Sequence, residues 1–330
     1  MKNLIITKST LPKVTFGIVT LNEEKRIKAC LSAIAIQEYP KEKIEIIVMD
    51  GGSTDKTVEI AKKYRAKIYF NEKKLAEPGL AAAYQKATGD YMVFMAADNI
   101  IYDKYWTRKI VQPFLDDVDN ILVSFSRVVN SPSDNIWNKY LNEDTDPFSA
   151  FVFNNASCPD KFKKIYTVEK ENSHYAIYNY KIENFPLIAL AQCTVLKTKI
   201  RRKLNSNYDD ILPLIDIIKK GGKIAYVKDT GIYHFSVKGF THLRMKFKKR
   251  IFNSIKTDSY VSRESYVSTE RKIRRYLFLL YSFSLIIPLL EGIRLMIIKR
   301  KFYMLLHPIV SFIIGFYIII NFIKIKIWQK

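Results

Sequence analysis

Residues 43–64, KIEIIVMDGGSTDKTVEIAKKY, contain a strand, a turn and a helix in immediate succession. The apolar, β-branched run that ends at Asp50 is typical of a buried strand. The following GGSTD supplies turn glycines and a Ser/Thr/Asp cap, and a helix comes after it. This stretch therefore predicts one strand–helix unit whose strand ends in a carboxylate.

The same order repeats on both sides of this stretch. VTFGIVT at 14–20 is a β-branched run suited to a buried strand, and apolar residues at helical spacing follow it. KIYF at 67–70 predicts a third strand, and EPGLAAAYQKATGD predicts a short helix that leads into the strand of YMVFMAADNI at 91–100. Strands that alternate with helices, without internal repeats, predict an α/β fold with a mostly parallel, doubly wound sheet.

Three acids lie at or just after the ends of the predicted strands. They are Glu23, Asp50 and Asp98, and ligands of such sheets bind beyond the carboxyl ends of the strands. Each acid alone has a plain structural explanation, because Glu23 and Asp55 can cap helices, Asp50 can start a turn and Asp98 can be a surface acid. Together they would form a negative rim, which a nucleotide with a divalent ion would stabilise.

Two stretches resemble family 2 glycosyltransferases, which are inverting enzymes of the GT-A fold. They are FGIVTLNEEKRIKACLSAIAIQEYPKEKIEIIVMDGGSTDKTVEIAKKY at 16–64 and ATGDYMVFMAADNI at 87–100, and the likeness covers roughly residues 13–103. The resemblance implies a GT-A type, Rossmann-like sheet flanked by helices. It also implies a nucleotide-sugar donor of the UDP or GDP type.

The resemblance assigns roles to the residues at the strand ends. Thr20 and Glu23 would flank the nucleoside, Asp50 would contact the base, and Gly52 would shape the turn beneath it. Asp98 would be the second acid of the family's DxD motif and would hold Mn²⁺ or Mg²⁺ on the diphosphate. The first acid of that motif is replaced by Ala96, which puts one ribose or metal contact in doubt. The family's ARN stretch is also missing.

A second informative region is NSNYDDILPLIDIIKKGGKIAYVKDTGIYHF at 205–235. Asp209 and Asp210 precede an amphipathic helix, for which one aspartate suffices as an N-cap. By the resemblance, the pair matches the family's ED motif, in which the second acid is the general base. Asp210 is therefore the predicted base, with Asp209 as its support. His234 matches a family histidine that completes the metal site.

Positive charge dominates the C-terminal quarter of the chain. The net charge is +22, and residues 241–330 carry roughly +14 of it, from about 18 lysines and arginines against about 4 acids. Lys248 and Arg250 are candidates for contacts with the donor diphosphate, although anionic headgroups would explain most of these cations. The Gln-x-x-Arg-Trp signature of processive synthases is absent, which predicts transfer of one sugar per encounter.

Two apolar segments lie within this basic region, at 276–298 and 302–323. The second is long enough to span a bilayer, whereas Pro288, Glu291 and Arg294 interrupt the first, which either spans or lies in the interface. Basic clusters precede, separate and follow the two segments, and two full spans would place the middle cluster outside. The sequence leaves this conflict open.

These features predict four parts: a GT-A domain at 1–235, with a nucleotide-binding half at 13–103 and an acceptor half at 104–235; basic juxtamembrane or interfacial helices at 236–275; membrane helices at 276–323; and a basic tail at 324–330. The three cysteines, Cys30, Cys158 and Cys193, form no disulfide framework and fit a reducing cytosol.

The predicted function is metal-assisted transfer of one sugar from a nucleotide-sugar donor to a lipid-linked acceptor, either a polyprenyl phosphate or a glycan. The predicted location is the membrane, with the catalytic domain in the cytoplasm and membrane lipids as partners. Nucleic acid is not a predicted partner, because basic residues next to apolar segments indicate lipid. The alternative is a catalytically degenerate relative that binds a nucleotide or lipid as a partner in glycan assembly.

Overall fold

The computed structural model describes residues 11–117, 120–143, 145–198, 200, 211–256 and 268–328. These residues fall into two compact units. The first unit comprises the chain up to Val128 together with Val168–Asn179 and Ile188–His234. The second comprises Val129–Thr167, Tyr180–Leu187 and the part of the chain from Phe235 onward.

The first unit is built on one mixed sheet. Its strands are β1 (Val14–Thr20), β2 (Ile44–Asp50), β3 (Lys67–Phe70), β4 (Tyr91–Ala96), β5 (Asn99–Ile101), β6 (Ile121–Val129), β7 (Val168–Glu171), β8 (Tyr175–Tyr178), β9 (Gln192–Lys197) and β10 (Lys223–His234). In the described part of the chain they form a ten-stranded sheet in the order β3-β2-β1-β4-β9-β6-β10-β8-β7, and β5 pairs with β10 off this path.

The half of the sheet nearest the N-terminus is parallel. β1 pairs with β2 on one side and with β4 on the other, and β3 continues the parallel arrangement beyond β2. This confirms the predicted α/β fold with a mostly parallel sheet flanked by helices. In the rest of the sheet, β4–β9, β6–β9 and β10–β8 are antiparallel pairs.

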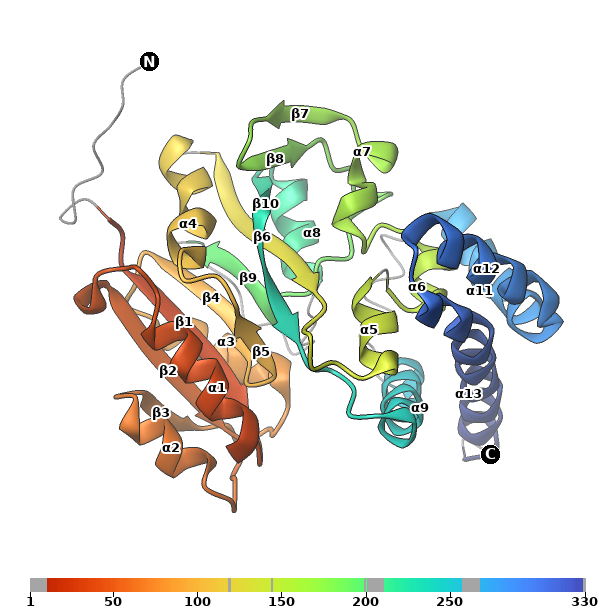
Figure 1. Ribbon diagram of the computed structural model, residues 1–330, viewed down its shortest axis with the longest axis horizontal. Helices are drawn as coiled ribbons and strands as arrows, with labels where there is room; N and C mark the ends of the chain where they lie inside the picture. The colour runs from red at the N-terminus through yellow and green to blue at the C-terminus, as the bar shows by residue number, and fades with distance from the viewer. Residues whose placement is uncertain are drawn as a thin grey trace. The chain divides into compact units, whose positions relative to one another are not determined.

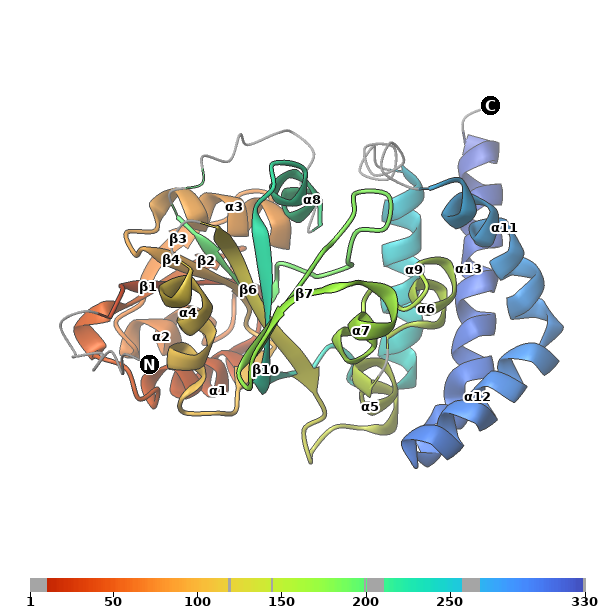
Figure 2. The same cartoon turned by 90° about the horizontal axis from the view of Figure 1, so that it is seen from above.

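Helices cover both faces of this sheet. α1 (Glu24–Ala35) and α2 (Thr57–Lys63) lie on the same face as α4 (Trp106–Asp116), and α3 (Ala76–Lys86) and α8 (Leu212–Lys219) lie on the other (Figures 1 and 2). Such a layered arrangement follows from crossover connections between parallel strands. It leaves the carboxyl ends of β1, β2 and β4 next to one another.

The core of the first unit lies between the sheet and its helices. Strand residues such as Phe16, Val48 and Val93 are fully buried, and so are Leu31 of α1 and Trp106 of α4. The central strands are apolar on both faces because helices cover both sides of the sheet. This core fixes the strand ends that carry the predicted site residues.

The second unit is helical. Its elements are α5 (Ile136–Glu143), α6 (Pro147–Val152), α7 (Phe162–Ile165), α9 (Phe240–Lys256), α11 (Thr269–Ser284), α12 (Ile286–Lys299) and α13 (His307–Trp328), with 3-10 turns at Pro159–Lys161 and Phe302–Leu306. Its core combines Tyr140 and Val152 with Phe247 of α9, Phe278 of α11 and Ile314 of α13.

Within the described ranges, one helix, Phe302–Lys324, is long and apolar enough to cross a membrane. Half of its most apolar window is buried against the rest of the protein. α11 and α12 meet the same test only as a pair, and they are bent by 88° at the break between them. By length and composition, these helices are compatible with membrane attachment.

Candidate nucleotide and metal site

The carboxyl ends of three adjacent strands bring the predicted nucleotide-binding residues to one edge of the sheet. Thr20 pairs in register with Asp50, and Val19 pairs with Ala96, two residues before Asp98. Thr20 is buried, and its Oγ1 has no hydrogen-bond partner among the residues that the structure describes. A buried hydroxyl without a partner is costly in the free protein, and a bound polar ligand would satisfy it.

Asp50 organises the turn that follows β2. Its Oδ2 accepts hydrogen bonds from the backbone N–H of Gly52 at 3.0 Å and of Ser53 at 2.9 Å. The Ser53 hydroxyl donates to Asp50 Oδ1 at 2.5 Å. Gly52 has a φ of +90°, a left-handed conformation that favours glycine. The carboxylate therefore starts the turn, as the plain structural explanation proposed, and it holds Gly52 beside the strand end.

The loop after β1 is fastened to the loop after β2. The Asn22 backbone N–H donates to Ser53 Oγ at 2.8 Å, and Asn22 Oδ1 accepts from the Thr54 N–H at 2.8 Å. The Glu23 N–H donates to Thr57 Oγ1 at 2.9 Å. The two loops therefore form one cross-linked surface at the sheet edge, and Glu23 is held within it.

Glu23 and Asp55, for which helix capping was the plain structural explanation, differ in their hydrogen bonds. Glu23 occupies the N-cap position of α1, but its side chain makes no capping hydrogen bond within the described structure and lies 4.0 Å from Arg26 Nε. Asp55 instead accepts from the Glu24 N–H at 3.1 Å and from the Thr57 N–H at 3.0 Å. Desolvation raises the pKa of Asp55, but the hydrogen bonds from Thr57 and Glu24 lower it more, so the pKa lies below its ordinary value.

Asp98 and His234 meet at the same edge. β4 ends at Ala96, and β5 begins at Asn99 and pairs antiparallel with β10, so that His234 lies opposite Asn99. Asp98 Oδ2 lies 3.6 Å from His234 Nε2. The side chains are 25% and 17% exposed, respectively. Both groups are therefore accessible to a small ligand while being held by paired strands.

Asn99 fixes the backbone that carries Asp98. It is fully buried, and its Nδ2 donates to the Ala191 carbonyl at 2.9 Å and to the Ala96 carbonyl at 3.2 Å. Its Oδ1 has no hydrogen-bond partner in the ranges that the structure describes. Asn99 thus joins the end of β4 to the segment before β9 and restrains the position of the Asp98 carboxylate.

Gln192 contacts the other ring nitrogen of His234, a contact that the sequence did not reveal. Gln192 Nε2 lies 3.2 Å from His234 Nδ1. The β4–β9 register shifts at this point, because Met95 pairs with Gln192 while Phe94 pairs with Thr194, and the skipped Cys193 has a φ of +56°. Such bulges reorient side chains next to functional sites. The sequence signal for this region was limited to the apolar run of β9. The bulge that turns Gln192 toward His234 depends on how β9 pairs with β4, which the sequence does not show.

These residues fit a divalent ion in part. The described chain contains no group of three or more His, Cys, Asp and Glu side chains able to hold a metal. Asp98 and His234 nevertheless offer one carboxylate oxygen and one imidazole nitrogen 3.6 Å apart. That separation suits two ligands of one ion, and nucleotide-bound ions take their other ligands from phosphate and water. The pair therefore fits an ion that arrives with a diphosphate.

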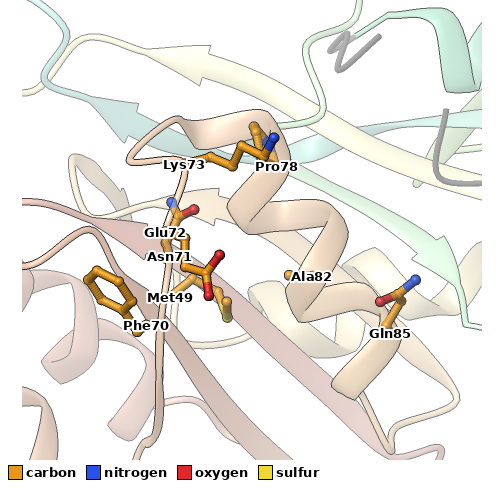
Figure 3. Close-up of a pocket in the computed structure, with 8 residues that line it drawn as sticks. All are labelled: Met49, Phe70, Asn71, Glu72, Lys73, Pro78, Ala82 and Gln85. Atoms are coloured by element: carbon orange, nitrogen blue, oxygen red, sulfur yellow. The ribbon is translucent and has the colours of Figure 1, made fainter. Parts of the chain in front are cut away.

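A cavity of about 210 Å³ lies beside the strand that ends at Asp50. The Asn71 N–H donates to the Asp50 carbonyl at 2.7 Å, and Asn71 Nδ2 donates to the Leu75 carbonyl at 2.8 Å. Figure 3 shows the cavity between the ends of β2 and β3 and helix α3. Its lining residues are Met49, Phe70, Asn71, Glu72, Lys73, Pro78, Ala82 and Gln85.

The remaining predicted site residues belong to the second unit or lie outside the residues that the structure describes. Asp209 and Asp210 are not among the residues that the structure describes. Lys248 and Arg250 lie on α9, which belongs to the second unit. Arg250 Nη1 is 3.4 Å from Asp146 Oδ2, the N-cap residue of α6. Thr20, Asp50, Asp98 and His234 are thus the predicted residues that the first unit gathers at its strand ends, with Glu23 in the adjoining loop.

Comparison with protein families gives one match that covers half of the chain. The family model described as glycosyl transferase family 2 matches residues 15–184. The matched segment contains the strand ends at Thr20, Asp50 and Asp98. His234 lies beyond it in the sequence and reaches Asp98 through the pairing of β10 with β5.

Two curated proteins illustrate the similarity at the sequence level. The chain is 39% identical over 91 residues to the dolichyl N-acetyl-alpha-D-glucosaminyl phosphate 3-beta-D-2,3-diacetamido-2,3-dideoxy-beta-D-glucuronosyltransferase of Methanococcus voltae, over 26% of this chain and 28% of that protein. It is 36% identical over 109 residues to glycosyltransferase AglE of Haloferax volcanii, over 31% and 36% of the two chains. The matches therefore span about a third of the length of these relatives.

Among solved structures, the chain is similar to the mannosyltransferase PcManGT from Pyrobaculum calidifontis in complex with GDP-Man and Mn²⁺. The TM-score is 0.55, with 16% sequence identity over 94% of this chain and 88% of that chain. At this level of identity the likeness is one of fold.

Proposed function

The chain belongs to glycosyl transferase family 2, and we propose that it transfers a single sugar from a nucleotide-sugar donor to a lipid-linked acceptor at a membrane surface. The observation that carries the proposal is the meeting of Asp98 and His234, 3.6 Å apart, beside the carboxyl ends of β1 and β2. Ligands of α/β sheets bind at this kind of edge.

The donor nucleoside binds across the ends of β1 and β2. The buried Thr20 hydroxyl, which has no partner in the described chain, offers a polar contact there, and the turn held by Asp50 presents backbone groups beside it. Glu23 lies in the loop that is fastened to this turn. A UDP- or GDP-type donor suits the site, and the structural neighbour PcManGT was solved with GDP-Man.

Asp98 and His234 hold Mn²⁺ or Mg²⁺ together with the donor diphosphate. A bound divalent ion supplies charge neutralisation on the diphosphate as it leaves. Support comes from the 3.6 Å separation of the two side chains, from their partial exposure, and from the Mn²⁺ in the complex of PcManGT. Ala96 stands where the family has its first motif acid, so Asp98 is the carboxylate on which this site depends.

Gln192 sets the tautomer of His234. If its amide oxygen faces His234 Nδ1, that nitrogen carries the proton and Nε2 keeps its lone pair toward Asp98. Turning the Gln192 amide by half a turn exchanges its oxygen and nitrogen. The oxygen then occupies the position 3.2 Å from His234 Nδ1 and accepts its proton in a hydrogen bond. Partners of this kind raise ligand basicity and fix the ring. Gln192 is therefore a positioning residue.

Asp210 takes the proton of the acceptor hydroxyl, and Asp209 supports it. Both roles follow from the family's ED motif, and the amide N–H groups of the following helix α8 favour negative charge at its start. If the acceptor were instead a polyprenyl phosphate, the attacking group would already be anionic and would need no base. The role of Asp210 therefore depends on the chemical class of the acceptor.

A lipid-linked acceptor is supported by two observations. Phe302–Lys324 is long and apolar enough to cross a membrane, and the cations of residues 241–330 suit anionic headgroups. The named activity of the Methanococcus voltae relative uses a dolichyl-linked sugar phosphate. Attachment at the membrane brings the acceptor and the site to the same surface, and the catalytic domain faces the cytoplasm.

Ala96 supports one competing function. Loss of the first motif acid is compatible with a degenerate relative that binds a nucleotide or lipid within a glycan assembly pathway without catalysing transfer. A non-catalytic partner has no need for Asp98 and His234 to be held together, whereas a metal-dependent transferase does. We therefore favour catalysis.

Calorimetric titration of the detergent-solubilised protein with UDP and GDP, each with and without Mn²⁺, tests the proposal. We expect one nucleotide to bind in a metal-dependent manner and Asp98→Ala to abolish the metal dependence. Glu59→Gln on α2 is the matched control, because it removes an acid that pairs with Lys63 on the helix surface. Failure of both nucleotides under all conditions would favour the degenerate relative or a donor with another base.

A further inference from the structure

The C-terminal helices expose many large apolar side chains around the bend between α11 and α12. Leu285, Ile286 and Ile287 form the apex of this bend, and Ile286 is 68% exposed. Leu280 on α11 and Leu290 on α12 are also exposed on the two arms. We call the two arms and their apex the apolar wedge. Exposed apolar patches of this kind mark contact with a membrane or a protein partner.

The bend has a local cause. Pro288 lies four residues after Ser284, and a proline ring clashes with the carbonyl four residues earlier in a helix. The chain breaks at this position, since α11 ends at Ser284 and Leu285 has a φ of +56°. The resulting 88° angle brings both arms back against α13, and Figure 2 shows the apex lying away from α13. The apex of the wedge, with the exposed residues Leu285, Ile286 and Ile287, therefore projects away from α13.

α13 is exposed along one side. Ile309, Phe312, Phe316, Ile319 and Ile323 are exposed and recur at alternating intervals of three and four, which places them in one stripe. The positions between them include the buried residues Val310, Ile314 and Tyr317. One-sided exposure of this kind is expected for a helix lying at the surface of a bilayer.

A basic helix runs along α13. α9 packs against it, as Figure 2 shows, and the Asn321 Nδ2 of α13 donates to the Lys248 carbonyl of α9 at 3.3 Å. Arg244, Lys248, Lys249 and Arg250 are exposed on α9. Lys248 and Lys249 lie level with Asn321 and Lys324, at the end of the apolar segment, so α9 brings positive charge to the end of α13, where it would meet lipid headgroups.

We propose that the second unit binds an anionic leaflet from one side, with the apolar wedge inserted and α13 lying along the interface instead of crossing the bilayer. The two arms of the wedge then return to the same side, so the exposed cations Lys272, Arg300, Lys301 and Lys324 face the anionic headgroups, whereas Arg271 is buried and Lys299 donates to the Glu143 carbonyl. This removes the conflict with the positive-inside pattern. The inference rests on the proposed membrane attachment and not on the transfer reaction.

A lipid leaflet fits the surface better than a second copy of this chain. The exposed cations Lys272, Arg300, Lys301 and Lys324 lie within or directly after the helices that carry the exposed apolar residues. Two copies pressed together through the wedge would bring these like charges into proximity. Anionic headgroups instead match them at about 1 kcal/mol per basic residue near the surface.

Cysteine accessibility on sealed vesicles tests the orientation. Cys30, Cys158 and Cys193 are buried, so reaction of the native thiols with a membrane-impermeant maleimide should be slow. The full chain carrying Lys301→Cys or Lys324→Cys is added to preformed phosphatidylglycerol and phosphatidylcholine vesicles. Lys25→Cys, on the exposed surface of α1, reports labelling from the outside. We expect both variants to react as completely as Lys25→Cys without detergent.

The apex supplies a second test. Ile286→Glu should weaken binding to the same vesicles by at least about tenfold in a flotation assay. Ile36→Glu is the matched control, because Ile36 is 63% exposed but lies at the end of α1, and it should bind like the unaltered protein.

The outcomes separate the inference from the proposed function. Protection of either Lys301→Cys or Lys324→Cys until detergent is added would show that α13 crosses the bilayer, which overturns the in-plane arrangement but keeps membrane attachment. Failure of the unaltered chain to bind vesicles, with self-association through the wedge, would overturn both the inference and the attachment. Neither result would alter metal-dependent nucleotide binding, which reports on the transferase site independently.

Discussion

Tyr140 and His307, 167 positions apart in the chain, share a 2.8 Å hydrogen bond inside the second unit. The other ring nitrogen of His307 contacts the Tyr281 hydroxyl at 2.7 Å, so one imidazole joins α5, α11 and α13. His307 and Tyr140 are both buried. A neutral imidazole offers one donor and one acceptor, which means that one hydroxyl donates and the other accepts.

Tyr140→Phe should therefore destabilise the protein by about 1–3 kcal/mol, because it leaves a ring nitrogen of His307 buried without its partner. Chemical denaturation in detergent, followed by tryptophan fluorescence, measures the change. Tyr276→Phe is the control, since Tyr276 is 76% exposed on α11 and should not alter the midpoint. Equal midpoints for the two variants would show that the hydrogen bond adds no stability.

Glu45 should make the first unit sensitive to acid. Burial alone would raise the pKa of Glu45, but hydrogen bonds from Lys67, Thr15 and Thr88 lower it from 4.5 to about 2. The ionised form is thus stabilised by folding, and this contribution, on the order of 3 kcal/mol, is present above pH 4.5 and is lost as the pH falls toward 2.

Urea unfolding at pH 7, 4.5 and 3 tests this dependence. At pH 7, Glu45→Gln should be less stable than the unaltered protein. Most of this difference in unfolding free energy should disappear as the pH falls through this window. Glu42→Gln, at an exposed position three residues earlier, should follow the unaltered protein throughout. A Glu45→Gln deficit that is the same at all three values would rule out ionisation as its cause.

Gln192→Ala should weaken Mn²⁺-dependent nucleotide binding by about 10- to 100-fold, the range found when partners of metal-ligating histidines are removed. The reason is loss of the 3.2 Å contact that orients His234. Titration of Mn²⁺ at fixed nucleotide gives the apparent Kd, and metal-free nucleotide binding should be unaffected. Gln112→Ala on α4 is the control. A uniform loss of all nucleotide binding would indicate a structural role.

Asp210→Asn should lower transfer by about 10²- to 10⁴-fold without changing donor affinity, as expected when a general base is removed. Asp216→Asn, at an exposed position on α8, is the control. Single-turnover transfer to a lipid-extract acceptor, together with nucleotide titration, measures both quantities. Full transfer by Asp210→Asn would instead identify an acceptor that attacks as a phosphate anion.

The strands and turns of the first hundred residues could be predicted because their signals are local. The apolar runs of β1, β2 and β4 and the turn at Gly52 are visible in short windows of sequence. The Asp98–His234 contact could be anticipated only through family resemblance, since it depends on β5 pairing with β10. The contact of Gln192 was missed because a bulge at Cys193, formed against β4, positions it.

The C-terminal helices show the same limit. The sequence identified two apolar segments and Pro288 as an interruption. The 88° bend, however, follows Ser284, four residues earlier, whose carbonyl would clash with the proline ring in a continuous helix. The position of α9 beside α13 depends on contacts between segments far apart in the chain. Hydropathy therefore indicated the apolar character of the region, whereas its arrangement required the packed structure.

The hydrogen bonds between the loops after β1 and β2 have a consequence for engineering the proposed nucleotide site. Asn22, Glu23 and Glu24 take their positions from Ser53, Thr54, Asp55 and Thr57, so neither loop has an independent conformation. Grafting only one of them from a homologue would break bonds on both sides. Exchange of nucleotide preference should therefore require residues 21–24 and 51–57 to be transplanted together, as a single cassette.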